Sequence, residues 1–395
     1  MKSNLVPLAV ALCILLGIPA AQGQTIKIGV ISTYSGANGQ YGETMDRGLK
    51  LYMKHNADKL PPGVKVELIE RDDGGANPDL AKRLAQELIV RDKVDFLTGF
   101  VWTPNAMAVA PLITEAKVPA VILNAASSQI TTASPYFVRF SFTEWQVAYP
   151  LGQWASKRYK RAYQIVSDYA PGYDEEEGFA KGFAEGGGQI IGKVRVPLAT
   201  TDFAPFMQRA KDLKPDLVFG FVPAGKLSSQ LMKAFSDLGM DKAGIHFIGS
   251  GNLTTDEELQ GMGDVTLGKM TTYHYSVAAD RPANKAFQAL FKKEYGDKVV
   301  GNFVTVTAWD AMDAIYAAIR AQGGKVSAER SMESLRNYKN QNSPRGPISI
   351  DPETRDIVQN IYIREVRRIG NQLANVELET IPNVKDPWKE LNRKK

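Results

Sequence analysis

Aromatic, hydroxyl and small side chains gather directly after several predicted strands of this 395-residue chain. The residues concerned are Tyr41; Phe100, Trp102 and Thr103; Ala125, Ala126 and Ser127; Tyr169, Tyr173 and Phe221; and Gly251 with Asn252. Ligands of open α/β sheets bind outside the carboxyl ends of the strands, so we expect these side chains to surround one small molecule. Aromatic faces, hydroxyls and exposed backbone amides suit a small apolar carboxylate. Any single aromatic residue here fits core packing equally well, and only the coincidence of the loops favours a site.

The residues that carry most enzymatic chemistry do not form a recognisable catalytic pattern. His55, His246 and His274 lack the spacing of metal ligands, and no Gly-x-Ser-x-Gly segment is present. Asp72 and Asp73 are adjacent at the end of a predicted strand, so their side chains point to opposite faces. We therefore interpret this pair as loop hydrogen bonding or capping. The sequence predicts no catalytic residue, no metal site and no cofactor.

A glycine-rich segment, Ser35 to Gly42, lies between the first predicted strand and the helix that follows it. Its spacing is Gly-x-x-Gly-x-x-Gly, which differs from the Gly-x-Gly-x-x-Gly of dinucleotide sites, and the next strand ends in an acid too far along the chain. A nucleotide site is therefore disfavoured. Two interpretations stay open, a tight turn and backbone amides that contact an anion.

Short apolar runs alternate with helical periods, which is typical of βα units and a parallel sheet. A first series has strands at 26–31, 64–69, 95–99 and 119–123, with helices at 43–56, from Pro78 onward, and at 105–116. A second series follows a boundary near 141–144, with strands at 162–166, 190–196, 217–221 and 245–249 and helices at 144–157, 175–185, 203–213 and 226–238. The last section predicts helices at 284–295 and 304–322 and a strand pair at 347–350 and 357–365, and the segment after Asn371 is polar.

The chain opens like a secretory signal peptide. Lys2 precedes an apolar run from Leu5 to Ala21, and small residues precede an expected cleavage after Gly23. A lipoprotein signal at Cys13 is a poorer alternative, because Leu12 stands where a small residue is wanted. Cys13 is the single cysteine, so the mature chain contains no disulfide or thiol nucleophile.

Composition excludes several other classes. The chain is 44% hydrophobic and 23% charged, which is ordinary for a folded globular protein. A net charge of +5 without a run of five basic residues gives little support for a nucleic-acid partner. After the leader, no apolar run approaches the ~18 residues of a membrane span. We expect an exported, soluble protein of about two domains.

Several short segments carry a resemblance when they are taken in order. They are Lys27-Ile28-Gly29-Val30, Ser35-Gly36, Gln40-Tyr41-Gly42, Arg71-Asp72-Asp73 with Pro78, Leu123 to Ser127, Tyr173 with Glu177-Gly178, Asp202-Phe203, Asp216-Leu217-Val218 and Gly346-Pro347-Ile348. Together they resemble the branched-chain amino-acid-binding proteins of ABC importers over essentially the whole mature chain. The resemblance implies a type I periplasmic binding protein fold, in which two Rossmann-like lobes with parallel sheets enclose the ligand by hinge closure.

This resemblance also implies the organisation and the partners of the protein. Three crossover segments would join an N-terminal lobe, residues 24–142 and 275–356, to a C-terminal lobe, residues 143–274 and 357–395. The protein would be periplasmic and monomeric, and it would deliver its ligand to the membrane permease subunits of an ABC importer.

Ligand contacts carry over residue by residue. Thr103 stands where the family places a hydroxyl on the ligand carboxylate, and Ala125, Ala126 and Ser127 form the loop that binds the same group. Tyr41 and Tyr173 stand at the aromatic positions that cover the ligand side chain. Trp102 occupies a position that is a disulfide cysteine in some members.

One expected residue is missing. Amino-acid binders carry a glutamate for the ammonium group where this chain has Gly251-Asn252. Burying an unpaired ammonium is costly, so the sequence favours an aromatic or other hydrophobic carboxylate over a branched-chain amino acid. The amino-acid alternative stays open if Asp168 or Asp310 supplies the acid. A ligand sensor on the same fold is a further alternative, and a hydrolase is disfavoured.

Overall fold

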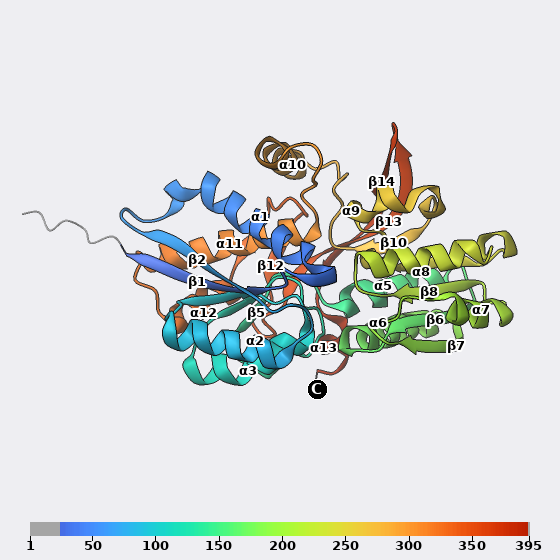
Figure 1. Cartoon of the computed structure of the whole chain (residues 1–395), viewed down its shortest axis with the longest axis horizontal. Coiled ribbons are helices and arrows are strands. Elements are labelled where there is room, and N and C mark those ends of the chain that lie inside the picture. Colours follow the sequence, from blue (N-terminus) through green and yellow to red (C-terminus); the bar gives the residue numbers. More distant parts are fainter. Residues whose placement is uncertain (1–23, 394–395) are drawn as a thin grey trace, which may run out of the picture.

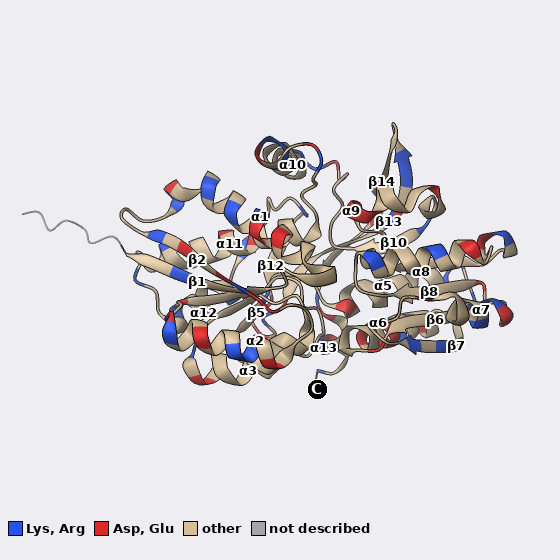
Figure 2. Cartoon of the chain, in the orientation of Figure 1, with Lys and Arg blue, Asp and Glu red and all other residues tan. Residues whose placement is uncertain are grey.

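The computed structural model describes residues 24–393, so the predicted signal peptide lies outside the described residues. Two lobes lie side by side (Figure 1). None of the helices in the described part of the chain is long and apolar enough to cross a membrane. Basic and acidic residues are interspersed along the helices of both lobes (Figure 2).

The first lobe is built on a parallel sheet of five strands in the order β2-β1-β3-β4-β5. The strands are β1 Thr25–Ser32, β2 Lys65–Asp72, β3 Phe96–Gly99, β4 Ala120–Ile122 and β5 Phe137–Arg139. Its helices are α1 Gln40–His55, α2 Pro78–Gln86, α3 Thr103–Ala116, α4 Ile130–Ala133, α10 Pro282–Tyr295, α11 Phe303–Ala321 and α12 Ala328–Arg336. Although α11 is distant in sequence, it returns to pack along α1 (Figure 1).

The second lobe holds a mixed sheet in the order β11-β12-β13-β10-β9-β8-β6-β7, with β14 paired to β13. Its strands are β6 Arg161–Ser167, β7 Gln189–Val196, β8 Leu217–Phe221, β9 His246–Ser250, β10 Met270–Tyr273, β11 Lys339–Asn340, β12 Ile348–Ile350, β13 Ile357–Ile369 and β14 Gln372–Val384. The helices are α5 Glu144–Ser156, α6 Ala170–Glu185, α7 Ala204–Asp212, α8 Lys226–Asp237, α9 Asp256–Met262 and α13 Pro387–Leu391. Strands β6 to β10 are parallel, whereas β13 is antiparallel to its neighbours.

Three irregular segments lie at the junction of the lobes, and we name them for later use. The first connection, residues 140–143, and the second, residues 274–281, join elements of different lobes. The third connection, residues 351–356, joins β12 to β13 and lies beside β5 of the first lobe, where the Arg139 N–H donates to the Arg355 carbonyl. Strand β12 pairs with β13 of the second sheet, while Ile348 and Ile350 pack in the same hydrophobic core as α1 and α11. Because this segment contacts both lobes, the limits of the lobes stay a prediction.

Every strand predicted in the two series is confirmed, and so is the antiparallel pair β12–β13. The predicted start of one helix is wrong. Helix α6 begins at Ala170, with Pro171 in its first turn, rather than at Glu175. Proline suits the first turn of a helix, because the N–H it lacks would have no partner inside the helix. Tyr173 therefore lies inside the helix and not on the preceding loop.

Helices α5 and α6 pack closely through glycines in their middle and later turns. Gly178, Gly182 and Gly186 recur at every fourth position of α6 or its cap, which places them on one face. A Cβ atom added at Gly182 would lie 2.2 Å from the carbonyl oxygen of Tyr149, and one at Gly152 would lie 2.4 Å from that of Phe179. The two helices thus run side by side in backbone contact, and both begin at the junction of the lobes (Figure 1).

We predict that Gly182→Ala destabilises the protein, because its methyl group has to displace the backbone of α5. The expected loss is about 1–3 kcal/mol of unfolding free energy, the usual cost of overpacking. Gly261→Ala, in helix α9, is the matched control, because a Cβ there meets no atom within 4 Å. Urea denaturation of both variants measures the difference. Equal stabilities would show that α5 and α6 separate easily.

Candidate functional site

A narrow cavity lies between the two lobes. Its walls come from both sides, and its lining residues are Tyr41, Val101, Trp102, Thr103, Asn124, Ala126, Phe142, Glu144, Tyr169, Pro171, Pro223, Ala224 and Asn252. A second hollow adjoins it and shares Tyr41 and Ala224.

Several helices point their N-termini at this cavity. The lining residues Thr103, Glu144 and Pro171 belong to the first turns of α3, α5 and α6, and Ala224 lies two residues before the start of α8. The first N–H groups of a helix have no partner within it, and this end carries partial positive charge. The arrangement is therefore suited to a small anion.

Aromatic rings form the apolar walls. The ring centroids of Tyr41 and Trp102 are 6.3 Å apart. The indole N–H of Trp102 donates to Thr33 Oγ1 at 2.9 Å, and the Thr33 hydroxyl donates to Asp73 Oδ1 at 2.7 Å. Asp73 also accepts from the Asn105 amide at 2.9 Å. This chain of bonds fixes the indole, and it confirms loop hydrogen bonding as the role of the adjacent acids.

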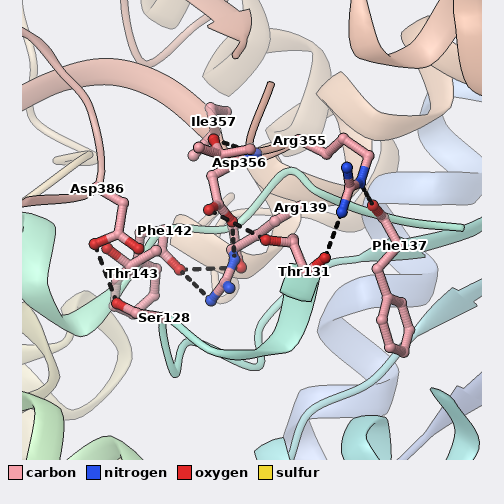
Figure 3. A network of polar contacts seen from close by, with 12 residues as sticks. Ser128, Thr131, Phe137, Arg139, Phe142, Thr143, Arg355, Asp356, Ile357 and Asp386 are labelled. Atoms are coloured by element: carbon pink, nitrogen blue, oxygen red, sulfur yellow. Dashed lines mark hydrogen bonds and ion pairs between the residues drawn. The ribbon is translucent and has the colours of Figure 1, made fainter. Parts of the chain in front are cut away.

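The loop after β4 is bonded to the buried guanidinium of Arg139 (Figure 3). Arg139 donates to the carbonyl oxygens of Ala125 and Ser127, at 3.3 and 2.8 Å, and its Nε pairs with Asp356 at 2.9 Å. Thr103 Oγ1 accepts from the Ser127 N–H at 3.4 Å. The loop therefore presents its other side to the cavity in a fixed shape.

The two lobes are bonded across the cleft. The backbone N–H of Ser128, in the first lobe, donates to Asp174 Oδ2 of α6 at 2.8 Å. The N–H of Glu144, at the start of α5, donates to the carbonyl of Ala126 at 3.0 Å. These contacts join the carboxylate-binding loop predicted from the sequence to the second lobe, so the structure has a closed cleft.

Two buried acids lie at the start of α5 and α6. Glu144 is 3% exposed and Glu175 is fully buried. Burial, together with the charges of Glu175 and Asp174, raises the pKa of Glu144 well above its ordinary value. Burial also raises the pKa of Glu175 to about 8 and that of Asp174 to about 6. At neutral pH the Glu144–Glu175 pair therefore holds a proton.

The sequence patterns did not indicate that Glu144 and Glu175 form a buried pair. A glutamate in the first turn of a helix is ordinary, and Glu175 stands in a run of four acids, Asp174 to Glu177, which resembles a solvated surface. One signal was available. Glu175 lies three residues before Gly178, on the glycine face that packs against α5. An acid on such a face is buried.

Six of the residues expected to surround a ligand line the cavity, namely Tyr41, Trp102, Thr103, Ala126, Tyr169 and Asn252. The others lie behind this layer. Ala125 and Ser127 are buried in the loop beside Ala126, and Gly251 is packed against the ring of Tyr273. Phe100 meets Phe137 edge to face in the core of the first lobe, at a centroid distance of 6.1 Å.

The second lobe presents Tyr169 to the cavity rather than Tyr173. The Tyr173 hydroxyl donates to Asp168 at 2.8 Å, and Arg195 covers its ring at 4.1 Å. Phe221 stacks behind Tyr169, with centroids 6.2 Å apart. The Asp168 side chain thus bonds away from the cavity, and Asp310 is buried against Arg345 at 2.8 Å. Within residues 24–393, no group of three His, Cys, Asp or Glu side chains is arranged to hold a metal ion.

The fold and the interlobe cavity define a solute-binding protein of the periplasmic type. Residues 25–371 match the periplasmic binding protein family, and the chain belongs to it. The predicted type I fold and the resemblance to branched-chain amino-acid-binding proteins are confirmed.

Individual relatives are similar over nearly the whole chain. "Leu/Ile/Val-binding protein homolog 6" of Brucella abortus is 41% identical over 374 residues, which are 94% of this chain and 95% of the relative. A solute-binding protein of an ABC transporter from Rhodopseudomonas palustris BisB5, in complex with 3,4-dihydroxybenzoic acid, is 46% identical, with a TM-score of 0.88 over 92% of this chain and 99% of that one. A second from R. palustris, in complex with 4-hydroxybenzoate, is 44% identical, with a TM-score of 0.89 over the same shares.

The buried acid pair predicts a dependence of stability on pH. Because Glu175 has a raised pKa in the folded state, the folded protein holds a proton that the unfolded chain releases above pH ~4.5. Its contribution is therefore present at low pH and is lost as the pH rises toward about 8. Between pH 5 and 8, Glu175→Gln should remove a decline of the order of 2–4 kcal/mol. Urea denaturation across this range measures it, and parallel curves for both proteins would contradict it.

Proposed function

We propose that this protein captures aromatic carboxylates and delivers them to an ABC importer. The observation that carries the proposal is a cavity whose walls are aromatic rings and whose ends are helix N-termini. A flat ring stacks between Tyr41, Trp102, Phe142 and Tyr169, while its carboxylate meets the first N–H groups of α3 and the Thr103 hydroxyl. The aromatic acids bound by the two R. palustris relatives support this choice.

The cellular setting completes the proposal. We infer that the leader before Gln24 is cleaved after export and that the mature protein acts as a monomer in the periplasm. Its partners are the permease subunits of the importer, and it carries out no reaction of its own. Support comes from the family and from the apolar leader in the sequence.

A branched-chain amino acid is the second candidate ligand. The name of the Brucella relatives favours it, and so does one feature of the cavity: Glu144 places an acid at its wall, where an ammonium group finds a partner. We rank it second because the acid pair keeps a proton, whereas an ammonium is best paired with a full carboxylate charge.

A ligand panel decides between the two candidates. At ~100 times its dissociation constant a ligand stabilises the folded protein by ~2.7 kcal/mol, which raises the melting temperature by several degrees. We expect this shift with benzoate derivatives and little shift with leucine, isoleucine or valine, measured by thermal denaturation at pH 7. Stabilisation by the amino acids alone would replace the aromatic acid with the second candidate.

Thr103→Val tests the carboxylate end of the cavity. The hydroxyl is buried and faces the loop after β4, so its loss removes a hydrogen bond to a charged group, worth ~1.5–3 kcal/mol. Affinity should fall by about 10- to 100-fold in isothermal titration calorimetry. Thr114→Val on the same helix is the control, because that hydroxyl bonds to Ala110 and Ser134, away from the cavity. Unchanged affinity of the Thr103 variant would place the carboxylate elsewhere.

A further inference from the structure

We propose that Glu144, backed by Glu175, selects aromatic acids that carry a ring hydroxyl, by accepting the hydrogen bond of that hydroxyl. This assignment rests on the proposed function, because it names the substrate class of the same cavity. Glu144 contacts the ligand, and Glu175 is a positioning residue that lies behind it.

Geometry brings the pair to the cavity. Glu144 is the first residue of α5 and lines the wall, and Glu175 lies in the second turn of α6. The helices are in backbone contact at Gly152 and Gly182, and the carboxyl groups of Glu144 and Glu175 lie close enough to interact. Apart from the proton that the acid pair itself holds, no N–H or O–H of the described residues donates to Glu144 Oε2. A buried acid oxygen without a donor at a cavity wall is an acceptor awaiting a ligand donor.

The surrounding charges explain why the pair takes a neutral donor. Asp174 adds a further acid from α6, and the phenol groups of Tyr41, Tyr169 and Tyr273 face the pair from other elements. Arg139 is the cation whose charge acts on Glu144, but its guanidinium is already paired with Asp356 and bonded to backbone carbonyls. Two close carboxyl groups without their own cation cannot both ionise, so the pair keeps a proton at neutral pH. A carboxyl oxygen of this pair can accept a hydrogen bond from a ligand hydroxyl.

Thr103 and Glu144 line the same cavity from different lobes. The carboxylate meets α3 and Thr103 in the first lobe, while the acid pair lies at the start of α5 and α6 in the second. A hydroxyl on the ring would therefore bond to one lobe while the carboxylate bonds to the other. Benzoate, which lacks the hydroxyl, leaves the Glu144 oxygen buried and unpaired, and sites of this kind discriminate strongly against the analogue without the donor.

The test compares benzoate, 4-hydroxybenzoate, 3,4-dihydroxybenzoate and 4-methoxybenzoate by isothermal titration calorimetry at pH 7. The unaltered protein should bind at least one hydroxylated acid about 10- to 100-fold more tightly than benzoate. 4-Methoxybenzoate, which has the oxygen but no donor, should bind no better than benzoate. This comparison needs no variant, so it stands whether or not the acid pair tolerates substitution.

Variants then assign the effect to Glu144. Glu144→Met should bind benzoate at least as tightly as the unaltered protein does, and its preference for the hydroxylated acids should fall to within about twofold. Glu177→Met is the matched control: it removes the same charge from the start of α6, but its side chain is exposed, so the preference should persist. An equal loss of affinity for benzoate and the hydroxylated acids in Glu144→Met would show a general structural role and overturn the assignment.

Failures of the two proposals are distinguishable. Equal affinities of the unaltered protein for benzoate, the hydroxylated acids and the methoxy acid would overturn the role of Glu144 and leave aromatic-acid binding intact. If none of the four aromatic acids binds and leucine does, aromatic-acid binding itself fails, and the role of Glu144 fails with it.

Discussion

The buried guanidinium of Arg139 connects most of what gives the site its shape. Its donors reach the carbonyls of the loop after β4, the carbonyl of Phe142 in the first connection and the carboxylate of Asp356 in the third (Figure 3). A buried ion pair of this kind adds little to stability over an apolar replacement, but loss of one partner leaves a charge unpaired. The bond network therefore fixes one geometry, in which the ligand loop and the first and third connections are set together.

Two further buried arginines bond to backbone carbonyls of the first and second connections. Arg345 is buried against Asp310 and donates to the carbonyl of Ser141 in the first connection, at 3.2 Å. Arg364 is equally buried and donates to the carbonyl of Tyr275 in the second connection, at 2.6 Å. Each connection is irregular backbone whose carbonyl groups need donors when they are buried. Arginine supplies several donors in a rigid plane, so one side chain satisfies such a segment and holds its direction.

Periodicity predicted most of the fold, because both sheets bury apolar runs between helices with one apolar face. It failed where pairing rather than hydrophobicity makes the element. Strand β14 is largely polar and is held by its hairpin with β13, and the sequence pattern did not indicate it. The site was predictable to the level of its loops. Which side chain of a loop turns inward depends on local geometry, so Tyr169 lines the cavity whereas Tyr173, one helical turn further on, bonds to Asp168.

The sequence did not indicate that Glu144 and Glu175 are buried together. This buried pair also bears on how closure of the lobes depends on ligand. Nothing in a run of acids tells which one is buried until the partner helix is known. Glu144 is buried in the closed cleft, and on our proposal only a ligand with a hydroxyl gives its oxygens a donor from outside the acid pair. Closure without that ligand leaves the oxygens unpaired, which disfavours the closed state. A ligand shifts the balance between open and closed forms only by its differential interaction with them, and this bond exists only in the closed form. The residue that selects the ligand would then also make closure depend on it.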